Sequence, residues 1–379
     1  MSGSFTIKLP DGKRRTIGGK APCFIIGEIG TNWHAGDSHD MTVAKRLIDA
    51  AAKAGCDAVK FQTYRPENVY APNAGTSDYL TAAGIRRPII DVIAERVMPV
   101  ELIAPLAAHA ASRNVVMMSS CFSIEDIALI DPHTPLHKLA SYEISHLRLI
   151  DRLAATGKPL LLSTGASTPQ DISWAVNRFR RKGGRGLAVL QCTAKYPAPD
   201  ASLNLAVIPW LERRFDCVAG LSDHSPHALW APVAAAALGA KIVEKHITLD
   251  KSAAGPDHFN SIEPNELAQM VAGIRAVERM IGDGRKRIEP AEAELAVFAR
   301  RRVQSMRAIA AGEVLREGEN MAILRPGKRK PGAHPRELPL LQGKVTTNAV
   351  AAGDGITRAV VKTKRGRTGA AARKKRNKR

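Results

Sequence analysis

The sequence predicts an α/β protein built on a (β/α)8 barrel and followed by a small β-rich module. Short apolar runs alternate with stretches of helical periodicity eight times over about 260 residues. Polar residues gather at the end of nearly every apolar run, where barrels of this class carry their chemistry. After residue 290 the chain changes to short β-prone runs separated by Gly, Asp and Asn. A doubly wound open sheet is the alternative, but it rarely uses eight uniform units.

The expected elements follow the chain in strict alternation. The eight strands are expected at 23–30, 56–63, 115–122, 136–141, 159–165, 187–193, 217–224 and 241–248. The eight helices are expected at 40–54, 100–114, 123–131, 145–157, 168–184, 203–215, 228–240 and 263–283. The first helix is typical, because Val43, Leu47 and Ala51 share one helical face and Gly55 ends it.

Four further segments complete the predicted organisation around a barrel domain at 23–290. Residues 1–22 are expected to form a hairpin with a turn in "LPDGKRR", closing the bottom of the barrel. The long segment 64–99 is expected to be an active-site lid or a subunit contact. Residues 300–361 form the β-rich module, and residues 362–379 form a tail.

The composition favours a reduced, cytoplasmic, globular protein. Of 379 residues, 45% are hydrophobic, which supports a full core. No apolar run approaches the ~20 residues that cross a bilayer, and the start of the chain has no apolar signal core. The five cysteines are odd in number and scattered, which disfavours a disulfide framework.

The net charge of +20 comes largely from the tail. Residues 362–379 carry ten Lys and Arg and no acid, so we expect them to be disordered and solvated. A weak contact with nucleic acid or an anionic surface is the alternative. No aromatic residue lies among these charges, so base stacking is not indicated.

Two strand ends hold the clearest candidate site. "GLSDHS" places Asp223 and His224 after one apolar run, and "KIVEKH" places Glu244 and His246 at the end of the next. Buried charges are costly unless they are paired or bind a ligand. Polar residues also mark the other strand ends, at Glu28, Lys60, Gln62, Ser119, Ser120, Lys138, Ser141, Ser163, Thr164 and Thr193.

Nine stretches together carry a family resemblance. They are "IIGEIGTNWHAGD", "AGCDAVKFQTY", "HKLASYEI", "GKPLLLSTGAST", "LQCTAKYPAP", "GLSDHS", "LGAKIVEKHITLD", "GPDHFNSIEPNEL" and "LRPG". The chain resembles the sialic acid synthases and the related bacterial synthases of pseudaminic and legionaminic acids. The β-rich module resembles the antifreeze-like (SAF, β-clip) domain of that family.

The resemblance implies a synthase that condenses phosphoenolpyruvate with the open-chain form of an N-acetylated amino sugar and releases phosphate. It implies a required divalent ion, Mn²⁺ or Mg²⁺, and a domain-swapped homodimer. By match to the family motifs, His224 and His246 hold the metal, and Glu28 and Glu143 are the catalytic carboxylates. Phosphoenolpyruvate is contacted by Lys60, Gln62, Ser120, Lys138, Ser141 and Ser163. The sugar is contacted by Tyr196 and Asp257, and by Arg325 from the small domain of the partner subunit.

Three departures from the family pattern leave the sugar open. Trp33 is inserted in "NWHAGD", Cys121 replaces the usual Pro, and Ala194 stands where sialic acid synthases often have Asn. The substrate is therefore either N-acetylmannosamine or a 2,4-diacetamido-2,4,6-trideoxy hexose. Two rival functions are a metal-dependent aldolase using pyruvate and a non-enzymatic protein that binds polyanions through its tail.

Overall fold

A closed barrel of eight parallel strands forms the centre of the first unit of the chain. The computed structural model describes residues 3–34, 39–82 and 84–361. Neighbouring strands pair in the order β10-β3-β4-β5-β6-β7-β8-β9, and β10 closes the barrel against β3. The strands are β3 (Phe24–Gly30), β4 (Ala58–Thr63), β5 (Val116–Cys121), β6 (His137–Leu139), β7 (Leu160–Ser163), β8 (Leu187–Cys192), β9 (Val218–Asp223) and β10 (Ile242–His246). The predicted fold class is confirmed.

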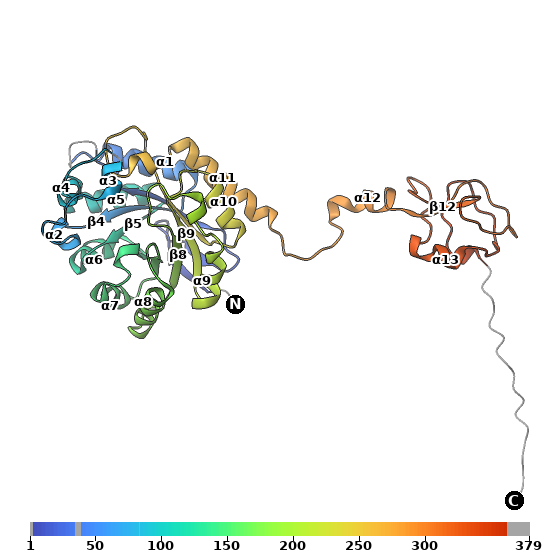
Figure 1. Cartoon of the computed structure of the whole chain (residues 1–379), viewed down its shortest axis with the longest axis horizontal. Helices are drawn as coiled ribbons and strands as arrows, with labels where there is room; N and C mark the ends of the chain where they lie inside the picture. Colours follow the sequence, from blue (N-terminus) through green and yellow to red (C-terminus); the bar gives the residue numbers. More distant parts are fainter. Residues whose placement is uncertain (1–2, 35–38, 83, 362–379) are drawn as a thin grey trace, which may run out of the picture. The chain divides into compact units, whose positions relative to one another are not determined.

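Eight main helices surround these strands (Figure 1). They are α1 (Thr42–Ala54), α5 (Val100–Ser112), α6 (Ile124–Ile130), α7 (Leu147–Ala155), α8 (Pro169–Arg181), α9 (Val207–Phe215), α10 (Trp230–Ala237) and α11 (Pro264–Met280). Local signals fix their ends. Thr168 and Asp171 form a reciprocal capping box at the start of α8, and Gly55 ends α1 in the left-handed conformation.

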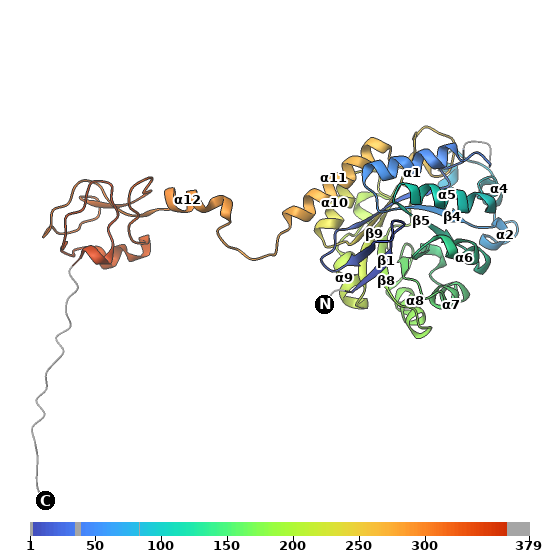
Figure 2. The ribbon, with the colours of Figure 1, turned by 180° about the vertical axis from the view of Figure 1, so that it is seen from behind.

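A hairpin packs against the amino-terminal end of the barrel. β1 (Ser4–Lys8) and β2 (Arg14–Gly18) pair in antiparallel register, and β1 is visible beside the barrel in Figure 2. Ile7 and Ile17 are buried in the same cluster as the inward-facing apolar residues of the strands. The barrel is therefore a packed core at this end, not a pore.

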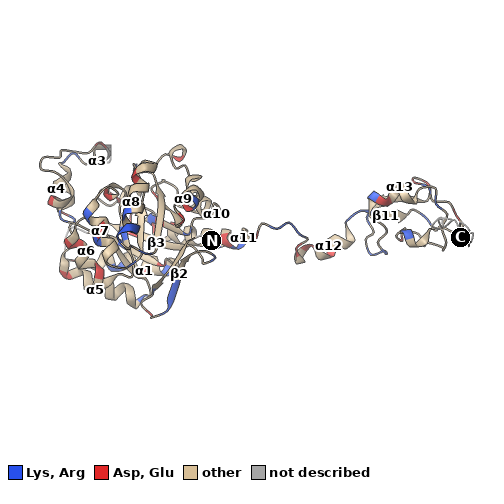
Figure 3. Cartoon of the chain, turned by 90° about the horizontal axis from the view of Figure 1, so that it is seen from below, with Lys and Arg blue, Asp and Glu red and all other residues tan. Residues whose placement is uncertain are grey.

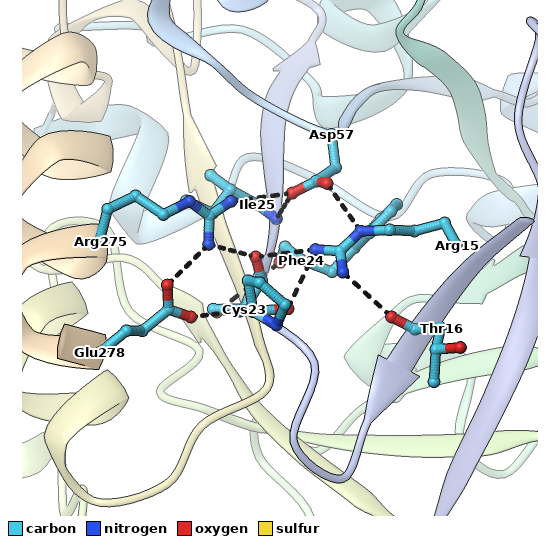
Figure 4. Close-up of polar contacts among 9 residues, drawn as sticks. Arg15, Thr16, Cys23, Phe24, Ile25, Asp57, Arg275 and Glu278 are labelled. Atoms are coloured by element: carbon cyan, nitrogen blue, oxygen red, sulfur yellow. Dashed lines mark hydrogen bonds and ion pairs between the residues drawn. The ribbon is translucent and has the colours of Figure 1, made fainter. Parts of the chain in front are cut away.

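A polar network also ties the hairpin to the barrel at this end (Figure 4). Arg15 Nε donates to Asp57 Oδ1 at 3.1 Å, and Arg275 Nη2 lies 3.3 Å from Asp57 Oδ2. Arg275 Nη1 also donates to the Cys23 carbonyl at 2.8 Å and to Glu278 Oε2 at 3.1 Å, while Glu278 accepts from the Cys23 amide. We call Arg15, Asp57, Arg275 and Glu278 the base cluster. It joins β2, β3 and β4 to the last helix of the barrel.

The segment between β4 and α5 contains three short helices. They are α2 (Pro66–Val69), α3 (Asp78–Ala82) and α4 (Ile89–Ala94), and Leu80, Ile89 and Val92 form a small apolar cluster between them. The predicted lid or subunit contact at 64–99 therefore has its own local core. Its role stays a prediction.

The chain divides into two compact units, Met1–Asp283 and Gly284–Arg379. In the second unit, β11 (Arg302–Ser305) pairs with β12 (Met321–Leu324), and isolated bridges such as Ile309–Val350 add further β structure. Val303, Leu315 and Ile356 lie in its separate apolar core. The unit also contains α12 (Ala293–Phe298) and α13 (Leu338–Leu341).

Basic and acidic residues are interspersed along both units (Figure 3). The predicted basic tail at 362–379 lies outside the described residues. Within the described residues, no helix has both the length and the apolar character needed to cross a membrane.

Candidate active site

The barrel interior changes from apolar to polar along every strand. Because side chains alternate between the two faces of a strand, every second residue points inward. The inward residues at the amino-terminal ends are Phe24, Ile26, Ala58, Val116, Met118, Leu136, Leu161, Ala188, Leu190, Val218 and Ile242. The residues that continue the same faces toward the carboxyl ends are Glu28, Lys60, Ser120, Lys138, Ser163, Cys192, Ser222 and Glu244. The sequence therefore builds a polar floor at the end of the barrel where chemistry is expected.

Four charged side chains meet on this floor, and we call Glu28, Lys60, Lys138 and Glu244 the mouth cluster. Lys60 Nζ lies 2.7 Å from Glu28 Oε2 and donates to Ser120 Oγ at 3.0 Å. Glu244 Oε1 lies between the two lysines, 3.8 Å from Lys60 Nζ and 3.9 Å from Lys138 Nζ. All four are between 1% and 5% exposed. The cluster holds equal numbers of acidic and basic groups out of water.

The mouth cluster keeps unused hydrogen-bonding capacity. Among the described residues, Lys138 Nζ donates a single hydrogen bond, a long one of 3.4 Å to the Leu139 carbonyl. Within the described residues, Glu244 Oε2 and Ser163 Oγ are buried without a hydrogen-bond partner. Buried polar groups are nearly always satisfied, so a set of open ones in one place points to a ligand. Two lysines and two serine hydroxyls (Ser120 and Ser163) favour an anion.

The two carboxylates of the cluster have opposite electrostatic environments. Burial raises the pKa of Glu28 to about 7, although Lys60 opposes the shift. Burial also disfavours the charged form of Glu244, but Lys138 and Lys60 outweigh it and lower the pKa of that carboxyl. Glu28 is thus the carboxyl that gains or loses a proton near neutral pH, which suits acid–base chemistry.

The two predicted metal ligands lie side by side above this floor. The rings of His224 and His246 have centroids 5.5 Å apart. His224 Nδ1 lies 2.9 Å from the Thr193 carbonyl, which can only accept, so Nδ1 carries a hydrogen. Burial disfavours the charged ring, but Cys192 outweighs burial and raises the pKa of His224, so a metal competes with a proton for Nε2. The Tyr196 ring packs on His224 at 4.1 Å and meets His246 edge-on at 6.1 Å.

These histidines fit a divalent cation. His246 Nδ1 is buried without a hydrogen-bond partner in the described part of the chain. Burial lowers the pKa of His246 to about 4, so the ring is neutral, as a metal ligand must be. A backbone carbonyl that orients one ligating imidazole is a common supporting contact. Among the described residues no third His, Cys, Asp or Glu completes a cluster, which leaves other positions for water or substrate.

Asp223 and Lys245 belong to the opposite face of the same two strands. Lys245 Nζ lies 2.7 Å from Asp223 Oδ2, and both side chains are fully buried. Ser225 donates its amide and its hydroxyl to the same carboxylate, at 2.8 Å and 2.9 Å. This ion pair is structural. It holds β9 against β10, and each of its residues immediately precedes one of the two histidines.

Two glycines let the surrounding loops approach the site. A β-bulge between Glu28 and Gly30 interrupts the pairing of β3 with β4, and Gly30 has φ of +56°. A side chain at Gly30 would lie 3.2 Å from both Glu28 Oε1 and Asp257 Oδ2. Gln62 Nε2 also donates to Glu28 Oε1, at 3.2 Å. Asp257, which accepts from Thr31 Oγ1 at 2.9 Å, is thus placed next to the mouth cluster.

Gly165 plays the same part on the other side of the barrel. Its amide donates to Ser141 Oγ at 2.9 Å. A Cβ at this position would lie 2.9 Å from the Cβ of Ala194 and 3.1 Å from Cys192 Sγ. Only glycine fits such an approach. Ser141 and Ala194 are therefore brought together beside the end of β7.

Four residues singled out from the sequence do not join these contacts. Glu143 is half-buried, and burial raises its pKa, but its carboxylate contacts no partner among the described residues by hydrogen bond or ion pair. Arg325 is exposed and belongs to the second unit. Trp33 is fully buried in the apolar core outside the barrel, and Cys121 is buried there as well. The insertion in "NWHAGD" therefore adds to the core at Trp33, while Ala35, Gly36 and Asp37 lie outside the described residues.

Two residues were given no role by the sequence reasoning. Glu244 was noted at a strand end, and its spacing of two from His246 already indicates that both share the inward face. His258 follows Asp257 in the loop after β10, and no pattern in the sequence distinguishes it from a structural histidine.

Comparisons with known proteins give a consistent result. The model of the NeuB family matches residues 47–286. The chain is 39% identical over 346 residues to the spore coat polysaccharide biosynthesis protein SpsE of Bacillus subtilis, covering 87% of this chain and 91% of the relative. It is 33% identical over 306 residues to the N,N'-diacetyllegionaminic acid synthase of Campylobacter jejuni, covering 80% and 90%. A solved sialic acid synthetase of Leptospira borgpetersenii, in complex with citrate, superposes with a TM-score of 0.68 at 29% identity, covering 78% and 96%.

Proposed function

Since the chain belongs to the NeuB family, we propose that it is a nonulosonic acid synthase that condenses phosphoenolpyruvate with an N-acetylated amino sugar and releases phosphate. The sugar reacts in its open-chain aldehyde form. The observation that carries the proposal is the mouth cluster, where two buried lysines share one ionised carboxylate and keep donors unused. A multiply charged small anion is the ligand that such a floor favours.

Phosphoenolpyruvate would bind with its phosphate and carboxylate toward Lys60 and Lys138. The hydroxyls of Ser120 and Ser163 line the same floor, and Ser141 and Gln62 stand at its edge. The Lys60 ammonium is held on one side by Ser120 and on the other by Glu28. On binding, the anion would replace Glu28 as the partner of Lys60, while the contact with Ser120 would remain. In the buried site each such charged contact is stronger than at the surface.

His224 and His246 would hold one divalent cation, Mn²⁺ or Mg²⁺. When bound, it would polarise the aldehyde oxygen of the sugar as a Lewis acid. Tyr196 keeps the His224 ring in place by stacking on it.

Glu28 is suited to the proton transfers of the reaction. C3 of phosphoenolpyruvate forms the new bond to the aldehyde carbon, and water adds to C2. A pKa of about 7 lets Glu28 take one proton of that water and return it to the phosphate as the C–O bond breaks. The second proton of the water ends on the hydroxyl formed from the aldehyde oxygen, as C2 becomes a ketone. Lys60 and Lys138 stabilise the charge on the departing phosphate. Glu143, which is half-buried after β6, is a second candidate for positioning the water or the sugar.

We propose a 2,4-diacetamido-2,4,6-trideoxy hexose as the sugar, with N-acetylmannosamine as the alternative. Ala194 supports this choice, because a methyl group in place of an amide removes one polar contact with the sugar. Asp257 and Tyr196 would contact the sugar. Arg325 would reach the site of a partner subunit from an antifreeze-like second unit, which requires a domain-swapped dimer.

The test is phosphate release from phosphoenolpyruvate with a panel of acetamido sugars and added Mn²⁺. Release that depends on both the sugar and the enzyme supports the proposal. Condensation with pyruvate and no release of phosphate would favour an aldolase. Activity that survives removal of residues 362–379 would exclude a function residing in the tail.

A further inference from the structure

Two tyrosines at the mouth of the barrel have exposed rings that the reaction described above does not use. Tyr142 lies in the short 3-10 turn Ser141–Glu143, which directly follows β6, and Tyr70 immediately follows α2, the first helix after β4. Both therefore lie at the carboxyl ends of the barrel strands, where the mouth cluster also lies. Tyr142 is 61% exposed and Tyr70 is 38% exposed. We call these two residues the rim pair.

The turn that carries Tyr142 is joined to the wall of the site by its own first residue. Ser141 Oγ accepts a hydrogen bond from the Gly165 amide at 2.9 Å, and a Cβ at Gly165 would lie 3.1 Å from Cys192 Sγ. Cys192 continues the inward face of β8. Burial raises the pKa of Tyr142, and the proximity of Cys192 adds to the rise. Tyr142 thus stands on the same wall of the mouth as the inward-facing Cys192.

Tyr70 belongs to the same side of the mouth. Burial raises its pKa, and the nearby carboxylate of Glu143 adds to the rise. Tyr70 in turn contributes to the raised pKa of Tyr142. Within the described residues, neither phenol makes a hydrogen bond, and the Glu143 carboxylate has no partner either. Two aromatic rings, two phenol hydroxyls and one carboxylate are therefore open to a ligand here, and the carboxylate disfavours an anion.

The strand order indicates which end of the sugar reaches this side. In the closed ring, β6 lies four strands from β10 in both directions, so Tyr142 stands opposite the strand that carries His246. In the proposed reaction the aldehyde lies at the cation held by His224 and His246, above phosphoenolpyruvate on the floor. A sugar extending across the mouth from that point brings its far end, C4 to C6, to the side of the rim pair.

We infer that the rim pair packs on methyl groups at the C4–C6 end of the sugar and so selects a 2,4-diacetamido-2,4,6-trideoxy hexose over N-acetylmannosamine. At C4 and C6 the first sugar carries an acetyl methyl and a terminal methyl, where the second carries two hydroxyls. Aromatic rings gain free energy by covering methyl groups, whereas hydroxyls covered by a ring lose their water. The Glu143 carboxylate accepts the N–H of the C4 amide. This inference rests on the proposed function and deepens it by naming side chains that recognise the far end of the sugar.

The experiment compares kcat/KM for the two sugars in wild type, Tyr142→Ala and Tyr142→Phe. Tyr142→Ala should lose about tenfold on the diacetamido sugar and less than about threefold on N-acetylmannosamine, because contacts with one or two methyl groups discriminate by this order. Tyr142→Phe keeps the ring, so it should retain the wild-type preference. Tyr70→Ala should show the same selective loss as Tyr142→Ala. The KM for phosphoenolpyruvate should stay the same in all three variants.

Trp174→Ala is the matched control, since Trp174 is 37% exposed on the outer helix α8 and should leave both sugars unaffected. Equal losses on both sugars in Tyr142→Ala, as expected if the rings serve only the fold or a contact between copies, would overturn the inference. An unchanged preference in Tyr142→Ala, or a wild-type preference for N-acetylmannosamine, would also overturn it and leave the proposed function standing. No phosphate release by the wild type with any sugar would overturn the proposed function and this inference with it.

Discussion

The mouth cluster and the base cluster are built from the same kinds of groups but differ in how completely those groups are paired. Each has two acidic and two basic side chains. In the base cluster the two arginines lie 2.8–3.4 Å from their acceptors. Their carboxylate partners Asp57 and Glu278 have side chains that are 17% and 24% exposed. In the mouth cluster the four groups are almost fully buried, yet Glu244 stands 3.8 Å and 3.9 Å from the lysines.

This difference separates structure from function. A buried charge that is fully hydrogen-bonded stabilises a particular chain arrangement, whereas one left partly open costs free energy until a ligand completes it. The base cluster therefore holds the hairpin, β3 and β4 against α11, and the mouth cluster is suited to binding an anion. Changes at the mouth should cost activity, and changes at the base should cost stability.

The largest effect is expected from removing the metal ligands above the mouth cluster. His246→Ala should lose Mn²⁺ binding and turnover together, because it leaves a single imidazole for the cation. Calorimetric titration with Mn²⁺ and phosphate release measure the two properties. Full turnover after chelation of the wild type would contradict the assignment of His224 and His246.

The next largest loss of activity is expected from Lys60→Met. We expect kcat/KM to fall about 10²- to 10³-fold, as when a group that stabilises developing charge is removed. The thermal unfolding temperature should change little, because Glu28 can take a proton when its partner is gone. A large loss of stability with a small loss of activity would place Lys60 with the structural charges instead.

Arg275→Met tests the other half of the comparison. It removes one donor each from Asp57, Glu278 and the Cys23 carbonyl, so the free energy of unfolding should fall by about 1–3 kcal/mol. The kcat of the folded enzyme should stay the same. Arg279→Met is the control one turn along α11, where the side chain is exposed and the cost should stay within about 0.5 kcal/mol. Equal costs for the two variants would show that the base cluster contributes nothing.

The last effect, similar in size, is the pH dependence of stability that Glu28 confers. Its pKa in the folded protein is raised from 4.5 to about 7, so the folded state binds this proton more tightly than the unfolded state. The resulting stability is fully present below pH 4.5 and is lost as pH rises through 7. Relative to Glu28→Gln, wild type should lose on the order of 1–3 kcal/mol between pH 5 and pH 8. Chemical denaturation at several pH values measures the difference, and parallel curves would contradict it.

The barrel and most of its polar floor could be predicted from the sequence, because alternation along strands is a local pattern. Lys60, Lys138 and the two histidines follow from strand ends alone. The ion pair between Asp223 and Lys245 could not be assigned, since it depends on the register between β9 and β10, which no local pattern fixes. The base cluster was also missed. Arg15, Asp57 and Arg275 are far apart in sequence, and only the closed barrel brings them together.

The loop residues of the site also include some that the sequence predicts and some whose position depends on the fold. Asp257 was found by its motif, whereas the proximity of its carboxylate to Glu28 depends on the bulge at Gly30. The insertion in "NWHAGD" was noted from the sequence, whereas the burial of the Trp33 ring in the outer core, where it stabilises the fold, depends on the packing around the barrel.

The central claim is that the mouth cluster is completed by phosphoenolpyruvate. The most direct measurement is the thermal unfolding of wild type and Lys138→Met, each with and without phosphoenolpyruvate. At a ligand concentration of about 100 Kd, wild type should gain about 2.7 kcal/mol of stability, seen as a clear rise in Tm. Lys138→Met should show little or no rise at the same concentration. An unshifted wild type, or an equal rise in both proteins, would contradict the claim.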